Sequence, residues 1–249
     1  MEWTDEAFVL AARRHGEGAA VVQLLTREHG RHAGLVHGGG SSSKRAIVEP
    51  GNRVQSNWRG RLPEHLGSVT LEVERSYAAS LMDDPKRLSA LAAACAVAEV
   101  ALPEREPHPA MFHATQALLD SLADTDDDVW PAVYIRWELG LLGELGFGLD
   151  LSTCAATGQS DDLIFVSPRT GRAVSREAGM LYQDKLLVLP GFLAPSEGTE
   201  ISATADDIRD GVTLTRYFLA RHVFDPLNKP LPGARDRLTD LLKDPPKSP

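Results

Sequence analysis

Short runs of apolar and β-branched residues alternate with turn residues over the first third of the chain. Five runs have the composition and length of β-strands, at residues 7–13, 19–26, 31–37, 53–59 and 69–77. The segments between them are rich in glycine, proline and serine, which supply the backbone angles that chain reversals need. Five short strands at this spacing predict a small closed barrel over residues 1–80.

From residue 83 onward the pattern becomes helical. Asp83 or Asp84 is suited to the N-cap position and Pro85 to the first turn of a helix at 86–101. Four further helices are predicted, the third beginning with a Thr204–Asp207 capping box, at 109–123, 131–145, 205–223 and 235–243. Residues 163–175 resemble a hairpin that turns at Thr170-Gly171, and residues 245–249 a frayed tail.

These elements predict an α+β protein with two domains. The barrel occupies residues 1–80, and a helical domain occupies residues 81–249 with a small hairpin insertion around 151–178. The apolar content of 43% and charged content of 24% are those of an ordinary folded protein.

Charge is distributed unevenly along the chain. The net charge is −9, which by itself argues against a nucleic-acid partner. Residues 11–61, however, hold nine Lys or Arg and only three acidic residues. We expect these cations to gather on one face of the barrel as a DNA-binding patch. Trp58 lies among them, either as a base-stacking platform or as a core residue.

The tract from Gly38 to Arg45, GGGSSSKR, has some likeness to a phosphate-binding loop. The likeness fails because Ser43 precedes the lysine, Arg45 follows it, and Pro50 interrupts the helix that should come next. A flexible basic loop that follows a phosphate backbone is the better interpretation, with a plain solvated linker as the alternative.

The sequence lacks the residues that several other classes of function require. Cys95 and Cys154 are too few for a disulfide framework or a four-thiolate metal site, and the histidine pairs have no further ligands nearby. Cys95 is expected to pack in the core of its helix. No nucleophile elbow, zinc-protease helix or paired-carboxylate motif occurs, so we expect no catalytic residue and no cofactor. The chain start lacks a secretory signal, and no apolar run could span a membrane, so a cytoplasmic location is expected.

Four phrases, in order along nearly the whole chain, resemble the RecO family of bacterial recombination mediators. They are AFVLAARRHGEGAAVVQLLTREHGRHAGLVHGGGSSS, SSKRAIVEPGN, GRLPEHLGSVTLEVE and LGLLGELGFGLDLSTCAATG. The resemblance implies an OB-type barrel followed by a helical domain. It further implies binding of single- and double-stranded DNA, annealing of complementary strands, and help to RecA in replacing the single-stranded-DNA-binding protein together with RecR in the RecF pathway.

The resemblance also suggests site residues. The expected DNA contacts are Arg31, Lys44, Arg45, Arg59 and Arg61, with Arg13 and Arg14 weaker. Arg136, with Trp137 beside it, is placed like a basic residue that holds the acidic tail of the single-stranded-DNA-binding protein. On the residues alone, a core and flanking role on an amphipathic helix is the alternative to a partner-binding groove for this pair. Many relatives bind zinc through two C-x-x-C pairs. The matching positions here are Cys154, Thr157, Ser175 and Ala178, so the metal should be absent and the hairpin held by the packing of Leu163, Phe165 and Val174.

Three alternatives stay open at this point. A general OB-fold RNA- or single-strand-binding protein would share the basic barrel but would not anneal strands. A non-catalytic protein adaptor would make the basic residues incidental. A nuclease or NTPase is disfavoured by the missing carboxylate and phosphate-loop motifs.

Overall fold

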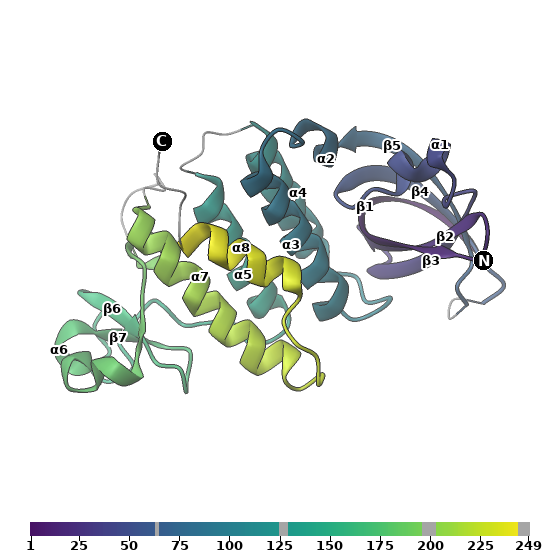
Figure 1. Cartoon of the computed structure of the whole chain (residues 1–249). Coiled ribbons are helices and arrows are strands. Elements are labelled where there is room, and N and C mark those ends of the chain that lie inside the picture. The colour runs from purple at the N-terminus through teal and green to yellow at the C-terminus, as the bar shows by residue number, and fades with distance from the viewer. Residues whose placement is uncertain (63–64, 125–128, 196–202, 244–249) are drawn as a thin grey trace. The chain divides into compact units, whose positions relative to one another are not determined.

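The computed structural model describes residues 1–62, 65–124, 129–195 and 203–243 (Figure 1). The chain forms two compact units, Met1–Ala123 with Pro232–Arg235, and Asp124–Leu231 with Asp236–Pro249. The tail predicted at residues 245–249 lies outside the described residues.

The first unit is built around a closed five-stranded barrel with strand order β1-β2-β3-β5-β4. Its strands are β1 (Glu2–His15), β2 (Ala19–Thr26), β3 (Arg31–His37), β4 (Asn52–Arg59) and β5 (Ser68–Ser76). All five predicted strands are present, so the α+β architecture with an OB-type barrel is confirmed. β1 begins five residues before its predicted start, because Trp3 and its neighbours extend the pairing with β4.

Alternating residues of each strand fill the interior of the barrel, as the period of two requires. This core includes Val9, Val22, Leu24, Val54 and Trp58. Trp58 is fully buried, and its indole N–H donates to the carbonyl oxygens of Ala33 and Leu66. It is therefore a core residue, and the interpretation of Trp58 as an exposed stacking platform is wrong.

Helices cover one outer face of the barrel within the same unit (Figure 1). They are α2 (Tyr77–Ser80), α3 (Pro85–Ala101) and α4 (Pro109–Asp124). Phe8 of β1 is buried between them and lies 5.1 Å, centroid to centroid, from the ring of Phe112. The Asp84 side chain caps α3, and Cys95 is buried in that helix, both as predicted.

Gly51, just before β4, lies where α3 approaches the barrel. Its φ is +88°, and a Cβ atom added there would lie 2.7 Å from the side chain of Leu91. Only glycine satisfies both the backbone angle and the close packing.

The second unit contains α5 (Trp130–Glu144), α7 (Ala205–Leu219) and most of α8 (Gly233–Lys243). Its core joins α5 to α7 through Ile135, Phe192 and Val212. The predicted capping box at Thr204 is present. The helix predicted to Val223 is α-helical only to Leu219, after which residues 220–224 widen into a π-helical turn.

A small sheet of order β7-β6-β8 also belongs to the second unit. The predicted hairpin corresponds to β6 (Leu163–Val166) and β7 (Ala173–Ser175), joined by a turn in which Gly171 has a φ of +67°. Leu163, Phe165 and Val174 are buried in it. The short helix α6 (Arg176–Gly179) and the edge strand β8 (Leu187–Val188), which lie next to this hairpin, were not predicted. Among the described residues, no helix is both long enough and apolar enough to cross a membrane.

Candidate nucleic-acid interface

The strand directions divide the predicted DNA-binding residues between two opposite ends of the barrel. β1 pairs antiparallel with both β2 and β4, so the end of β1 lies beside the start of β2, and the start of β4 lies beside Phe8 and Val9 in the middle of β1. We call this the Arg14 end, made by residues 12–20 and 38–51. The opposite end of the barrel is formed by the start of β1, the β2–β3 turn and the end of β4. We call it the Trp3 end, made by residues 1–3, 27–32 and 58–61.

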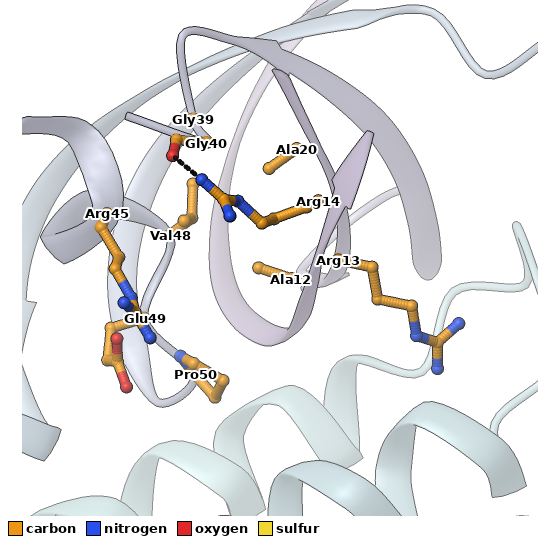
Figure 2. Close-up of a pocket in the computed structure, with 10 residues that line it drawn as sticks. All are labelled: Ala12, Arg13, Arg14, Ala20, Gly39, Gly40, Arg45, Val48, Glu49 and Pro50. Carbon is orange, nitrogen blue, oxygen red and sulfur yellow. Dashed lines mark hydrogen bonds between the residues drawn. The ribbon is translucent and has the colours of Figure 1, made fainter. Parts of the chain in front are cut away.

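A cavity of about 550 Å³ opens at the Arg14 end (Figure 2). It is lined by three arginines, one carboxylate and small or apolar residues: Ala12, Arg13, Arg14, Ala20, Gly39, Gly40, Arg45, Val48, Glu49 and Pro50. Figure 2 shows Arg14 directed across the cavity, where its guanidinium donates to the Gly40 carbonyl oxygen over 3.3 Å. Arg45 lies beside Glu49, and Arg13 points away from both other arginines.

The three arginines of this cavity differ in their partners. Arg13 is bound to Glu99 of α3, with 2.6 Å between Nη2 and the carboxylate oxygen. Neither Arg14 nor Arg45 lies within ion-pair distance of a carboxylate in the described part of the chain. Two guanidinium groups thus lie at the mouth of a cavity without an ion pair, although Glu49 is close to Arg45 (Figure 2). Such groups are suited to a phosphate oxygen.

The glycine-rich tract before Arg45 closes over this end of the barrel. Its last residues form one helical turn, α1 (Ser42–Arg45), and the Ser41 hydroxyl donates to the Gly38 carbonyl oxygen. The amides of Gly39 and Gly40 donate to the carbonyls of Val36 and Gly18, so these two amides are not free to cradle a phosphate. The tract forms a hydrogen-bonded turn that ends in α1, where a flexible basic loop was predicted. Lys44 is exposed on it and reaches back to the His37 carbonyl over 3.3 Å.

The remaining predicted DNA contacts lie at the Trp3 end. Arg31 exposes only 13% of its side chain, because it binds the Leu102 carbonyl, the Gln23 side chain and Glu104. The Arg31 side chain therefore links β3 to the segment that follows α3. Arg59 is 79% exposed and 4.0 Å from Glu2, and Arg61 is exposed without an ion pair to any described residue. The prediction of one continuous basic patch is therefore wrong, because antiparallel strands carry these cations to opposite ends.

Comparison with protein families identifies the chain. Residues 1–77 match the family model described as the Recombination protein O N terminal, and residues 82–230 match that of the Recombination protein O C terminal. The chain belongs to the RecO family. It is 55% identical over 245 residues to the DNA repair protein RecO of Rhodospirillum centenum, covering 98% of this chain and 95% of that protein. Similar proteins of the same name occur in Phenylobacterium zucineum, at 54% identity over 98% of both chains, and in Caulobacter vibrioides strain NA1000, at 52% over 98% of both.

The two residues that the RecO resemblance suggested for a protein partner lie on α5 and differ in accessibility. Arg136 is exposed, and its guanidinium donates to the Phe192 carbonyl oxygen over 2.8 Å. Trp137 is only 3% exposed and belongs to the core. Of the two side chains, Arg136 alone is placed where a partner could reach it.

Of the four positions that match the RecO zinc ligands, Cys154, Thr157 and Ser175 come together but lack the chemistry to bind the metal. Cys154 is 1% exposed, its Sγ lies 3.4 Å from the Ser175 hydroxyl, and Ala178 offers no ligand atom. No cluster of three or more His, Cys, Asp or Glu suited to a metal occurs among the described residues. Structural zinc needs four thiolate or imidazole ligands, so this donor set does not fit zinc.

Hydrogen bonds replace the metal at Cys154. Burial raises the pKa of this thiol, but donors from the side chains and backbones of Ser175 and Thr157 outweigh burial and lower the pKa to about 6. The Ser175 amide is one of these donors, at 3.3 Å from Sγ. The thiol thereby links residues 154–157 to β7.

Sequence reasoning missed an aromatic cluster at the Trp3 end. Trp3, His29, His32 and Trp58 come together there, although Trp58 had been considered only for base stacking or the core, and the two histidines only as metal ligands. The signal was present in the alternation of Trp3, Asp5, Ala7 and Val9, which share one face of β1. Charged residues at positions 2, 5 and 6 obscured it.

Proposed function

We propose that this chain binds single- and double-stranded DNA through the Arg14 end of its barrel and serves as a recombination mediator without catalytic chemistry of its own. The observation that carries the proposal is the cavity at which Arg14 and Arg45 lie without a carboxylate partner among the described residues. On a chain of net charge −9, such groups are favourable places for a polyanion. The relatives named DNA repair protein RecO support the same assignment.

Binding at this end follows from counterion release. A strand that places phosphates against Arg14, Arg45 and the exposed Lys44 frees the cations condensed around it, which favours association at low salt. These contacts reach the sugar-phosphate backbone and carry no base sequence. Affinity should therefore depend strongly on salt and little on sequence.

Strand annealing requires no catalytic residue under this proposal. Two complementary strands repel one another, and a cationic surface that neutralises phosphates on both lets base pairing begin. The protein then helps RecA replace the single-stranded-DNA-binding protein, acting in the cytoplasm at the nucleoid. RecR and the acidic tail of the single-stranded-DNA-binding protein are the proposed protein partners, the tail at Arg136. We assign DNA binding to the barrel domain, residues 1–80, and partner binding to residues 81–249.

Annealing of complementary oligonucleotides tests this function. The charge-reversed double variant Arg14→Glu, Arg45→Glu should lose most single-strand binding and most annealing. The matched control is Arg176→Glu, Arg209→Glu, which changes the net charge equally in the second unit, where both arginines are exposed and ion-paired. The control should anneal like the unmodified chain. Annealing that is equally reduced in both variants would contradict a site at the Arg14 end, and binding of RNA without any annealing of DNA would favour a general RNA-binding role.

A further inference from the structure

The cavity at the Arg14 end of the barrel is closed on its inner side. Two residues of its lining, Ala20 and Val48, are only 3% and 4% exposed, and Val48 belongs to the barrel core. Because packed side chains fill the interior behind them, the cavity ends there and does not run through the barrel. Its volume is about 550 Å³. Small-molecule sites measure about 300 to 1,000 Å³, so the cavity has room for one nucleotide.

Hydrogen bonds fix the walls of this cavity. On one side, the Gly40 amide donates to the Gly18 carbonyl over 3.3 Å, which ties the glycine-rich tract to the turn between β1 and β2. On the other side, the buried Asn52 side chain donates to the carbonyls of Ala46 and Ile47 over 2.7 and 3.1 Å. A cavity with walls held in this way is formed before a ligand enters, so binding costs little ordering of the chain.

The charges of the lining are suited to a dianion. Arg14 comes from β1 and Arg45 from α1, so a ligand that fills the cavity would lie between two guanidinium groups (Figure 2). Glu49 is the one carboxylate of the lining and lies beside Arg45, while the charge of Arg13 is bound to Glu99. A phosphate monoester carries a charge of about −1.5 to −2 at pH 7, more than a phosphate within a strand. The monoester therefore gains most from the two arginines.

The closed inner side favours the end of a strand over its middle. A strand that continues in both directions would have to enter and leave by the same opening, which requires a sharp reversal of its backbone. A terminal nucleotide enters with one connection only. The apolar part of the lining, Ala12, Val48 and Pro50, can contact the sugar or base that carries the phosphate.

We propose that this cavity receives a phosphate monoester, the terminal phosphate of a DNA strand with its nucleotide, and holds it between Arg14 and Arg45. The inference rests on the proposed DNA binding and deepens it, because the Arg14 end then binds strand ends as well as the sugar-phosphate backbone. A free mononucleotide has the same chemistry as a phosphorylated strand end. The experiment therefore has to distinguish these two sources.

The test measures the affinity of the full chain for single strands of one sequence, each of about 16 nucleotides. The strands carry hydroxyl groups at both ends, a phosphate at the 5′ end, a phosphate at the 3′ end, or the same terminal phosphates capped as methyl esters. At least one phosphate-ended strand should bind about tenfold more tightly than the hydroxyl-ended strand, the effect of one further charge-assisted hydrogen bond. The methyl ester keeps the bulk of the phosphate with a single charge and should lose most of this preference.

Substitutions in the lining should change the preference in both directions. Ala12→Leu, which fills the cavity, should abolish it. The matched control is Ala33→Leu, which adds the same bulk at a half-buried position of β3 outside the lining and should keep the preference. Glu49→Gln removes the carboxylate beside Arg45 and should increase the preference, a gain that a purely structural role of Glu49 would not produce.

The outcomes separate the source of the phosphate from a failure of the proposed function. A preference for a phosphate-ended strand supports the strand end. Competition by deoxycytidine 5′-monophosphate without any preference among the strands would overturn the strand end and leave the cavity to free nucleotides. If all strands bind equally at low salt and the mononucleotide does not compete, the site is overturned while DNA binding stands. If no strand binds, the proposed function itself fails. Should Ala12→Leu fail to fold, the unmodified chain decides, and equal binding of the methyl ester and the free terminal phosphate contradicts the site.

Discussion

Removing the two unpaired guanidiniums of the Arg14 end should change the salt dependence of DNA binding by a calculable amount. The variant is Arg14→Ala with Arg45→Ala. The Arg14 side chain makes one hydrogen bond, of 3.3 Å, to the Gly40 carbonyl, and the Arg45 side chain makes no hydrogen bond or ion pair with a described residue. The loss of folding stability should therefore be no more than about 1 kcal/mol.

The magnitude follows from counterion release. Each phosphate neutralised on a single strand contributes about −0.7 to the slope of log affinity against log salt concentration. Two contacts thus account for a slope of about −1.4. Between about 50 and 200 mM salt, the advantage of the unmodified chain over the variant should shrink about sevenfold, from about 70-fold to about 10-fold.

Fluorescence anisotropy of a labelled oligonucleotide, titrated at four or five salt concentrations, measures these slopes. The control is Arg176→Ala with Arg209→Ala, which removes the same formal charge from exposed, ion-paired positions of the second unit. Its slope should equal that of the unmodified chain. An unchanged slope in the Arg14, Arg45 variant would refute the reasoning, and equal flattening in both variants would show that net charge, and not position, determines affinity.

Three further predictions concern the scaffold. In urea denaturation, Gly51→Ala should destabilise the fold by about 1 to 3 kcal/mol more than Gly16→Ala. Both positions have positive φ, but only at Gly51 would the added Cβ atom meet a side chain, that of Leu91. Equal losses of stability would show that backbone strain acts alone. Tyr77→Phe should cost about 1 to 2 kcal/mol by losing its 2.5 Å bond to Asp120. Burial, with that carboxylate next, raises the pKa of Tyr77 to about 12, so the cost should be constant below pH 10 and decline between pH 10 and about 12; a decline beginning below pH 10 would contradict it. The ultraviolet absorbance of the Cys154 thiolate should appear with a midpoint at its pKa of about 6, and Cys154→Ser should lack this signal. The unfolding free energy of Cys154→Ser should fall further below that of the unmodified chain as the pH rises from 6 to 9, because the folded chain holds the thiolate. A midpoint near pH 9 would contradict the hydrogen-bonded thiolate.

Strand positions were predictable because alternation and turn residues determine them locally. The strands at 19–26 and 31–37 match the structure residue for residue, and the helix caps at Asp84 and Thr204 were readable as short-range signals. The start of β1 was missed because its acidic residues conceal an inward-facing Trp3 whose pairing partner is 55 positions away.

The site was less predictable because it depends on direction and on distant partners. Arg14 and Arg59 each lie near the end of a strand, but β1 and β4 are antiparallel, so the two residues lie at opposite ends of the barrel. Arg13 and Arg31 looked like free cations. Each is bound by the segment of residues 99–104, a consequence of helix packing that composition does not contain.

The same reasoning applies to Trp58. Its place in the sequence among arginines favoured base stacking and burial about equally. The structure buries it and leaves the half-buried Trp3, stacked against it, as the ring nearest to solvent. Which of two stacked rings is exposed is decided by the closure of the barrel around them.

The central claim is that the Arg14 end of the barrel contacts DNA, and cross-linking tests it most directly. A single strand carrying photoreactive bases, irradiated with the full chain and mapped by mass spectrometry, should give adducts in peptides covering residues 12–20 and 38–50. Adducts confined to residues 129–243 would contradict the account.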